Sequence, residues 1–373
     1  MEHYPDIAYR IALATYKNVN LGVARTIAER GISPEEFFTL PLADLQVRSG
    51  INARTLRDNS RAEALQAALR ELDFMEKHNV KAVLWDDEAF PNRMKQCDDA
   101  PAILFAGGNP KFEYKHIVSI VGTRRCSAYG ADICRQLVTE LASKLDDLLI
   151  VSGLAYGIDI AAHRAALAAG VPTGAILAHG LNTLYPAEHR SEARAMMRAN
   201  GFIATEYTAN SPIHRGQFLA RNRIVAALAD VVIIVESDIK GGAMATARIA
   251  NAYSREVCAV PGRLTDKYSR GTNSLIYNNE ATLIRDADDI IACCGWTPKP
   301  KEGQQQTLDF ELNPDQQRII NALRRNPDNT VNELSIALDI PVSKLSGILF
   351  EMEMDSLIVA IPGGRYCIID ANL

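Results

Sequence analysis

The middle of the chain alternates between short, nearly continuous apolar runs and longer segments in which apolar positions recur at helical spacing. Apolar runs of this length indicate strands that are buried on both faces. Strands that alternate with helices predict βαβ units, a parallel sheet with helices on both faces, and right-handed crossovers. The predicted strands are 117–121, 148–151, 173–178, 202–205, 230–236 and, as the last strand, 257–260, and the predicted helices begin at 128 and cover 160–169, 187–200, 217–229 and 243–253.

The loop after the first of these strands has the features of a phosphate-binding turn. The strand ends at Gly122 and Thr123, and a helix opens soon after, so backbone N–H groups would face outward at the helix N-terminus. Arg124 and Arg125 add planar charges with forked donors that suit phosphate. The GxGxxG spacing of a dinucleotide turn is absent, because two arginines follow Gly122-Thr123. These residues predict a phosphate site, with an ordinary basic surface loop as the alternative.

A second turn of this kind follows strand 148–151, where Ser152 and Gly153 precede a helix. Asp159 and His163 lie four residues apart on that helix and share one of its faces. We expect His163 to be a half-buried side chain bonded to the Asp159 carboxylate. No metal site is expected there, because no cluster of ligands accompanies the histidine.

The loops beyond the carboxyl ends of the predicted strands carry small and polar residues. In open α/β sheets ligands bind at this edge, so we expect these loops to form one site. They are Gly122–Arg125, Ser152–Gly153, Asn182 with Tyr185, Glu206–Tyr207, Gly241–Gly242 with Thr246, and Pro261–Gly262.

Positive charge gathers near these strand ends, although the formal net charge of the chain is −5. Nucleic-acid binding needs a local basic patch, and Arg215, Arg221, Arg223 and Arg263 supply one. Arg221 and Arg223 are expected near a helix N-terminus, where the macrodipole disfavours cations. They therefore require an anionic partner, and pairing with local carboxylates is the alternative. Phe218 lies among them, either as a stacking platform for bases or as a core residue.

Several motifs in one order resemble the DNA-processing protein A (DprA) family, also called Smf. They are IVGTRRCSAYG at 120–130, VSGLAYGIDIAAH at 151–163, the Tyr185-Pro186 loop, TEY at 205–207, FLARNRIVAAL at 218–228, VVIIVES at 231–237, GGAMATA at 241–247, VPG at 260–262 and GTNSLI at 271–276. The resemblance implies a Rossmann-like fold with extra elements that binds single-stranded DNA, usually as a homodimer. It also implies loading of the RecA recombinase onto incoming DNA, which is thereby protected, during natural transformation. It implies no cofactor and no established catalytic activity.

This sequence departs from the family pattern in two places. Gly241-Gly242 stands where the family often has Ser-Gly, and Leu219-Ala220 stands where Phe-Pro is common. Neither change removes a charge. The candidate DNA-binding residues are Gly122, Thr123, Arg124, Arg125, Ser127, Ser152, Gly153, Arg215, Phe218, Arg221, Asn222, Arg223, Gly242, Thr246 and Arg263.

The rival class is a nucleotide-binding or nucleotide-hydrolysing enzyme on a related Rossmann-like fold. Fold alone does not separate the two classes. Such an enzyme would need a carboxylate base in the cleft, and Glu206 and Glu236 are the candidates. Binding of an oligonucleotide compared with binding of a mononucleotide discriminates between them.

The regions before and after the sheet predict further domains. Helical patterns at 7–14, 23–29, 34–40 and 54–74 indicate a small helical domain over 1–74, similar to the helix-hairpin-helix or sterile-alpha-motif-like modules of this family. Packing or self-association is its expected role. The extended Rossmann-like domain then covers 75–295, with homodimer contacts expected through 231–235 and 271–291. The polar, proline- and glutamine-containing segment 296–313 predicts a flexible linker.

The last part of the chain, 314–373, predicts a winged-helix domain. Helical patterns cover 314–323, 331–338 and 342–355, and a hairpin follows at 358–361 and 366–369. Cations must neutralise phosphates in duplex binding, but this region is acidic, so we expect a protein-interaction or regulatory role. Over 311–373 the acidic residues are Glu311, Asp315, Asp328, Glu333, Asp339, Glu351, Glu353, Asp355 and Asp370, and the basic residues are Arg318, Arg324, Arg325, Lys344 and Arg365.

The compartment expected from the sequence is the cytoplasm. No apolar run is long enough to span a bilayer, and the first residues, MEHYPD, lack the form of a signal peptide. The 7 cysteines are an odd number without a repeating spacing, which is typical of reduced thiols.

Overall fold

The computed structural model describes residues 4–51, 61–299, 313–326, 329–354, 357–361 and 364–368. The chain forms two compact units, Met1–Lys299 and Pro300–Leu373. Most of the expected linker, 300–312, lies outside the described residues. Its first part packs on the first unit, because the Lys299 N–H donates to the Lys144 carbonyl at 2.6 Å and the Trp296 ring lies 4.6 Å from that of His116.

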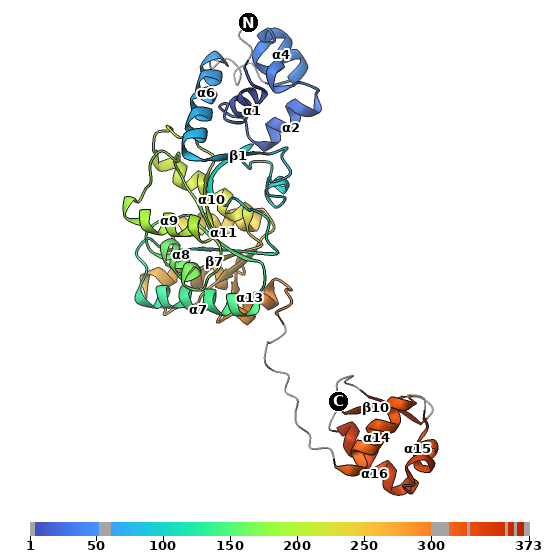
Figure 1. Cartoon of the computed structure of the whole chain (residues 1–373). Coiled ribbons are helices and arrows are strands. Elements are labelled where there is room, and N and C mark those ends of the chain that lie inside the picture. The colour runs from blue at the N-terminus through green and yellow to red at the C-terminus, as the bar shows by residue number, and fades with distance from the viewer. Residues whose placement is uncertain are drawn as a thin grey trace. The chain divides into compact units, whose positions relative to one another are not determined.

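A mostly parallel sheet is the centre of the first unit (Figure 1), as the alternating pattern predicted. Its spatial order is β1-β2-β6-β5-β4-β3-β7-β8-β9, with β1–β2 and β2–β6 antiparallel and every other pair parallel. The strands are Lys81–Leu84 (β1), Ile103–Gly108 (β2), His116–Val121 (β3), Leu148–Ser152 (β4), Thr173–Ile176 (β5), Phe202–Thr205 (β6), Val231–Ile234 (β7), Glu256–Ala259 (β8) and Thr282–Leu283 (β9).

Three of these strands were not predicted. β1 and β2 are joined without an α-helix, so the alternation that indicates βαβ units is missing there. The expectation that 257–260 is the last strand was wrong, because the two-residue β9 follows it and forms the edge. A strand of two exposed residues leaves no hydrophobic pattern in a sequence.

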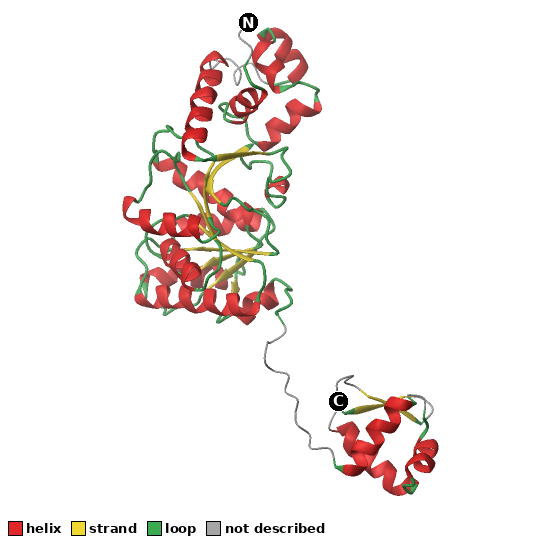
Figure 2. Cartoon of the chain, viewed as in Figure 1, coloured by secondary structure: helices red, strands yellow, loops and turns green. Residues whose placement is uncertain are grey.

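Helices cover both faces of the sheet (Figure 2). Successive residues of a strand point to opposite faces, so Val118 and Ile120 of β3 belong to one core cluster, and Ile117 and Val121 belong to the other. The first cluster packs under α7 (Ala128–Lys144), α8 (Ile158–Ala168) and α13 (Ala287–Cys293), with α9 (Arg190–Arg198) beside them, and the second lies under α10 (Arg215–Leu228), α11 (Gly242–Ala252) and α12 (Arg270–Tyr277).

The N-terminal helices pack on the β1–β2 end of the sheet. They share a core with Ile103 and Phe105 of β2, and they belong to the same compact unit as the sheet. The last helix continues past the boundary expected at residue 74, and part of the pattern expected at 54–74 lies outside the described residues. The described helices are α1 (Asp6–Ala14), α2 (Leu21–Glu29), α3 (Pro34–Thr39), α4 (Leu42–Ser49) and α6 (Arg61–His78).

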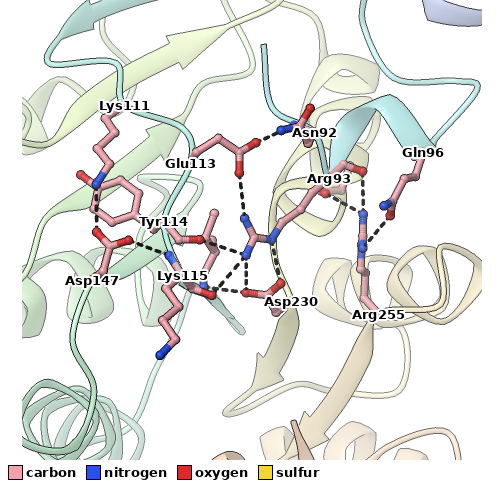
Figure 3. A network of polar contacts seen from close by, with 12 residues as sticks. Asn92, Arg93, Gln96, Lys111, Glu113, Tyr114, Lys115, Asp147, Asp230 and Arg255 are labelled. Carbon is pink, nitrogen blue, oxygen red and sulfur yellow. Dashed lines mark hydrogen bonds and ion pairs between the residues drawn. The ribbon is translucent and has the colours of Figure 1, made fainter. Parts of the chain in front are cut away.

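A polar network closes the amino end of the central strands (Figure 3). The Arg93 guanidinium donates to both carboxylate oxygens of Asp230, at 2.7 and 2.9 Å, and to Glu113 at 3.3 Å. Asp230 also accepts from the backbone N–H of Ile117 at 2.8 Å, and Arg255 donates to the Arg93 carbonyl at 2.6 Å. These charges are used within the fold, so the opposite, carboxyl edge is the one left for a ligand.

The second unit has the helices and hairpin of a winged helix, as predicted. Ile319, Leu334, Leu345 and Leu349 are among its fully buried core residues. Lys344 is the single cation of the would-be recognition helix, and its amino group donates to Asp315 at 2.7 Å. The elements are α14 (Pro314–Arg325), α15 (Val331–Leu338), α16 (Val342–Met354), β10 (Ile358–Ile361) and β11 (Arg365–Ile368), and the two strands pair antiparallel.

Candidate nucleic-acid interface

A pocket of about 420 Å³ lies beyond the carboxyl ends of β3 and β7. The structure brings most of the sequence-predicted residues together around it, although they come from three separate segments, the loop after β3, helix α10 and the start of α11. Ala155, Asp159, Lys240 and Tyr268 complete much of the remaining wall. The candidate residues that line the pocket are Gly122, Thr123, Arg124, Arg215, Phe218, Arg221, Asn222, Gly242 and Thr246.

The loop that carries Arg124 is held rigidly. The Thr123 N–H donates to the Glu236 carbonyl at 2.7 Å, and the Thr123 carbonyl accepts from the Ile158 N–H at 3.2 Å. Gly157 has φ +78°, and a Cβ at this position would lie 2.1 Å from the Thr123 carbonyl oxygen. The glycine therefore allows the two loops to meet. The backbone is fixed while the Arg124 side chain is left exposed.

Phe218 and Arg124 form the polar–aromatic centre of the pocket. The Arg124 guanidinium lies 5.3 Å from the centre of the Phe218 ring, a cation–π distance. The Phe218 ring meets Tyr185 edge to face at 5.7 Å. Phe218 is half-buried, so it is neither the fully exposed platform nor the core residue of the two sequence interpretations. Its position leaves a ring beside a cation, which is the arrangement that single-stranded nucleic acids use.

Three exposed cations border the pocket: Arg124, Arg215 and Lys240. None of them forms an ion pair within the described part of the chain. Sequence reasoning missed Lys240, although its signal was present, because it follows a buried strand and directly precedes Gly241-Gly242. Gly241 caps α11 without a side-chain bond, so the positive end of that helix dipole also faces the pocket.

Arg221 and Arg223 do not stand where the sequence argument placed them. Helix α10 begins at Arg215, so both lie beyond its first turn, and the expectation of cations at the helix N-terminus holds for Arg215 alone. Arg221 is buried, and its guanidinium donates to the carbonyl oxygens of Gly153, at 2.7 Å, and Ile176. The Arg223 guanidinium donates to Glu206 at 2.6 Å. The alternative considered for these arginines was pairing with local carboxylates. Arg223 does pair with a carboxylate, although one from a different element, whereas the partners of Arg221 are backbone carbonyls.

Five other candidates lie apart from the pocket. Ser152 is fully buried, and its hydroxyl donates to the Ile120 carbonyl at 2.6 Å, so it supports the sheet. Gly153 packs against the Arg221 guanidinium, which a Cβ would meet at 2.3 Å. Ser127 lines a neighbouring hollow of about 900 Å³ with Arg263. Arg125 lines a separate groove between α7 and α8.

Both carboxylates that a nucleotide-hydrolysing enzyme would need already accept hydrogen bonds within the protein. Glu206 accepts from Arg223, and Glu236 accepts from the backbone N–H of Ser127 at 2.9 Å and from its hydroxyl. Ser127 in turn caps α7 by accepting from the Gly130 N–H at 3.1 Å. In the described residues these two side chains act as an ion-pair partner and as a helix-cap support. No group of His, Cys, Asp and Glu that could hold a metal ion occurs in the same residues.

His163 differs from its prediction. It is fully buried, and its ring Nδ1 lies 2.7 Å from the Thr173 hydroxyl instead of the Asp159 carboxylate. The Thr173 hydroxyl donates to the Ile150 carbonyl at 2.8 Å, so His163 Nδ1–H is the donor to Thr173. Burial lowers the pKa of His163 to about 3, and the nearby charges of Arg221 and His189 act in the same direction.

This buried histidine predicts a pH-dependent stability. Its folded-state pKa lies below the ordinary value of 6.5, so between those two values the unfolded state binds a proton that the folded state does not. The free energy of unfolding should therefore fall as pH decreases from about 6.5, by up to about 1.4 kcal/mol per unit for this group. Urea denaturation between about pH 7 and pH 5 measures it. His163→Asn should show a smaller dependence, and an equal dependence would contradict the assignment.

The fold and the site define a class: a Rossmann-like α/β protein with a basic pocket at its strand ends, followed by a winged helix. The family model described as DNA recombination-mediator protein A matches residues 81–295, and the model described as DprA winged helix domain matches 303–364. The chain belongs to this DNA-processing (DprA/Smf) family.

Individual relatives agree with this assignment. Protein Smf of Escherichia coli (strain K12) is 30% identical over 303 residues, which are 79% of this chain and 79% of that protein. The X-ray structure of DNA processing protein A from Streptococcus pneumoniae has a TM-score of 0.63 and 28% identity, covering 78% of this chain and 98% of that one. A structure of DNA processing protein A from Helicobacter pylori gives insights into the single-stranded DNA binding mode of that protein. It has a TM-score of 0.51 and 33% identity, covering 57% of this chain and 94% of that one.

Proposed function

We propose that this protein binds single-stranded DNA in the strand-end pocket and acts as a recombination mediator. In this role it protects incoming DNA and loads RecA onto it during natural transformation. The observation that carries DNA binding is the set of three cations around the half-buried Phe218 ring, Arg124, Arg215 and Lys240, which form no ion pair among the residues that the structure describes. Phosphates meet the cations while a base stacks on the ring, without sequence preference. The Helicobacter pylori relative, whose structure is described by its single-stranded DNA binding mode, supports the same chemistry.

A competition titration tests this binding. The full chain is mixed with a labelled single strand, and unlabelled single strand, blunt duplex and AMP compete in separate series. We expect the single strand to compete far better than duplex, because the pocket is narrow and the Phe218 ring stacks only on a base that is not paired within a duplex. AMP should not compete at matched nucleotide concentration. Equal competition by duplex contradicts the proposal, and preferential binding of AMP supports a nucleotide enzyme instead.

We further propose a homodimer formed through the outer strand edge of the sheet. The expected contribution of 231–235 is withdrawn, because β7 lies between β3 and β8 and is fully buried. The segment 271–291 remains a candidate, since β9 is the edge strand and Tyr277 and Leu283 are exposed there. Light scattering at micromolar concentration should give a dimer, and a monomer with unchanged DNA affinity would count against it. RecA loading rests on membership of the family.

Catalysis is not part of the proposal. Glu206 and Glu236 are held by Arg223 and Ser127, which supports a binding role for the cleft. We also propose a cytoplasmic location. In the described residues no helix has the length and apolar character needed to cross a membrane, and all 7 cysteines are free thiols, in keeping with a reducing compartment.

Removal of the winged helix should leave single-strand binding nearly intact. Lys299 is bonded to the first unit, so the truncation is placed after it and deletes 300–373. The deleted unit is net acidic, and the Lys344 of its would-be recognition helix is paired, so its removal takes away more repulsion than attraction. We expect equal or slightly tighter binding, the difference being greatest at low salt. A large loss of affinity in a truncated protein with unchanged circular dichroism would show that this unit binds the strand.

A further inference from the structure

A second basic surface adjoins the strand-end pocket on the other side of the Arg124 loop. It is a groove of about 510 Å³ between α7 and α8, with an apolar floor that includes Ile160 and Ala165. Arg124 lines both the pocket and the groove, so the two hollows meet at this side chain. The polar residues of the groove are Arg124, Arg125, Arg135, Tyr156, Arg164 and His189.

The groove leads to the start of α9, which carries three exposed arginines. Arg190, Arg194 and Arg198 are four residues apart, so they form one row along the helix, and we call them the α9 arginine row. No ion pair is recorded for any of them in the described residues. His189, which lines the groove, directly precedes the row.

The direction of α9 places this row beside the site. The helix connects β5 to its parallel neighbour β6, so it runs against the strands and begins at their carboxyl edge. The row therefore starts where the groove ends and extends over roughly 12 Å, at about 1.5 Å per residue. Figure 1 shows α9 beside α8, on the same face of the sheet.

The acidic residues beside the row are already bonded on its groove side. Glu192 accepts from Arg164 at 2.6 and 2.9 Å, and Glu188 accepts from the Tyr156 hydroxyl at 2.9 Å. Like charges four residues apart destabilise a helix, so the row costs α9 stability without an evident gain within the fold. An anionic partner with regularly spaced charges offsets that cost, and the backbone of a nucleic-acid strand has this spacing.

We propose that bound single-stranded DNA leaves the pocket past Arg124, crosses the groove at Arg125 and Tyr156, and runs along the α9 arginine row. The row binds successive backbone phosphates. This inference rests on the proposed function and extends the same site, because it assigns a path to the part of the strand that the pocket does not hold. A strand that only fills the pocket does not reach α9, so the row contributes to the binding of long strands alone.

Two oligothymidylates test the path in the full-length protein, one of about 6 and one of about 30 nucleotides. Their affinities for the wild type and for the triple variant Arg190→Ala, Arg194→Ala and Arg198→Ala are measured by fluorescence anisotropy over a salt series. For the long strand we expect roughly tenfold weaker binding at low salt and a salt slope smaller by about 2, which is three contacts at about 0.7 each. The short strand should bind with unchanged affinity.

A charge-matched variant controls for net charge. Lys17→Ala, in the turn between α1 and α2, and Arg70→Ala and Lys77→Ala, on α6, remove the same charge from exposed positions. None of these side chains forms an ion pair in the described residues. Both oligonucleotides should bind this control as they bind the wild type. Thermal denaturation should give the control the midpoint of the wild type, because its substitutions are at the surface, and should give the row variant an equal or slightly higher midpoint, because the repulsion along α9 is removed.

The outcomes separate this inference from the proposed function. If the row variant keeps its affinity and slope for the long strand while Arg124→Ala weakens both strands, the row serves another anionic partner, such as a protein, and the path is wrong. Equal losses for the short strand, or for the charge-matched control, would reduce the row to a general electrostatic effect and overturn the path as well. If the wild type binds neither strand, the proposed function itself fails.

Discussion

Arg124→Ala is expected to weaken single-strand binding about ten- to a hundredfold at low salt. Arg124 is exposed at the mouth of the pocket, has no ion pair recorded in the described residues, and lies over the Phe218 ring. Its removal takes away one phosphate contact and a cation beside the stacking ring. The salt slope should fall by about 0.7, which is the loss of one phosphate contact to a single strand. A salt series of anisotropy titrations measures both quantities.

Two further variants sharpen this test. Arg70→Ala removes an exposed arginine from α6 and should change neither affinity nor slope. Arg223→Ala removes a charge near the pocket that is already paired with Glu206 at 2.6 Å, so the slope should stay unchanged there too. A slope that falls for Arg223→Ala and not for Arg124→Ala would mean that the wrong arginine has been assigned to phosphate.

Arg221→Ala is expected to destabilise the protein by about 3–5 kcal/mol, because it leaves buried polar groups without their partner. The guanidinium donates to the carbonyl oxygens of Gly153, just after β4, and of Ile176, the last residue of β5. Burial raises the pKa of Asp159, and the nearby Arg221 charge opposes that rise. Without Arg221, the carboxylate loses this opposing charge. Urea denaturation gives the free energy of unfolding directly.

Matched substitutions separate burial from charge in this prediction. Arg215→Ala removes an exposed arginine from the same helix and should cost less than about 0.5 kcal/mol. Arg221→Lys keeps a charge but lacks the planar fork that serves two carbonyls, so its stability should lie between those of Arg221→Ala and the wild type. If Arg221→Ala is as stable as Arg215→Ala and binds DNA less well, Arg221 contacts the strand directly and its structural role is wrong.

For the acidic winged helix, the charge composition says more about its binding partner than the fold does. A helix in this position often enters the major groove, yet α16 carries one lysine, and Asp315 of the same unit binds it. The sequence predicted that α16 carries little positive charge, and the structure shows that its one lysine, Lys344, is already paired. Both observations favour protein contacts over duplex contacts for this unit.

The sequence alone determined the strands β3 to β8, the order of these elements along the chain, and the edge that carries the candidate site. These features follow from short-range signals: apolar runs that mark buried strands, and glycines with polar residues where each strand ends. Arg124 could be assigned in the same way, because it directly follows Gly122-Thr123 in a strand-to-helix turn whose geometry is local. The three helices and the hairpin of the second unit could be predicted from the sequence equally well.

Only the tertiary structure decided which of the arginines are free. Arg221 and Arg223 stand two residues apart in one motif, and nothing local distinguishes them from Arg124. Their partners, the Gly153 carbonyl and Glu206, are distant in sequence and contact them only when the sheet and its helices have folded together. Burial removes the charge of Arg221 from the surface, and Glu206 neutralises the charge of Arg223. Both effects depend on contacts between segments that are distant in the sequence. The free charges that form the site are therefore set by packing, whereas its location is set by the pattern of strands and turns.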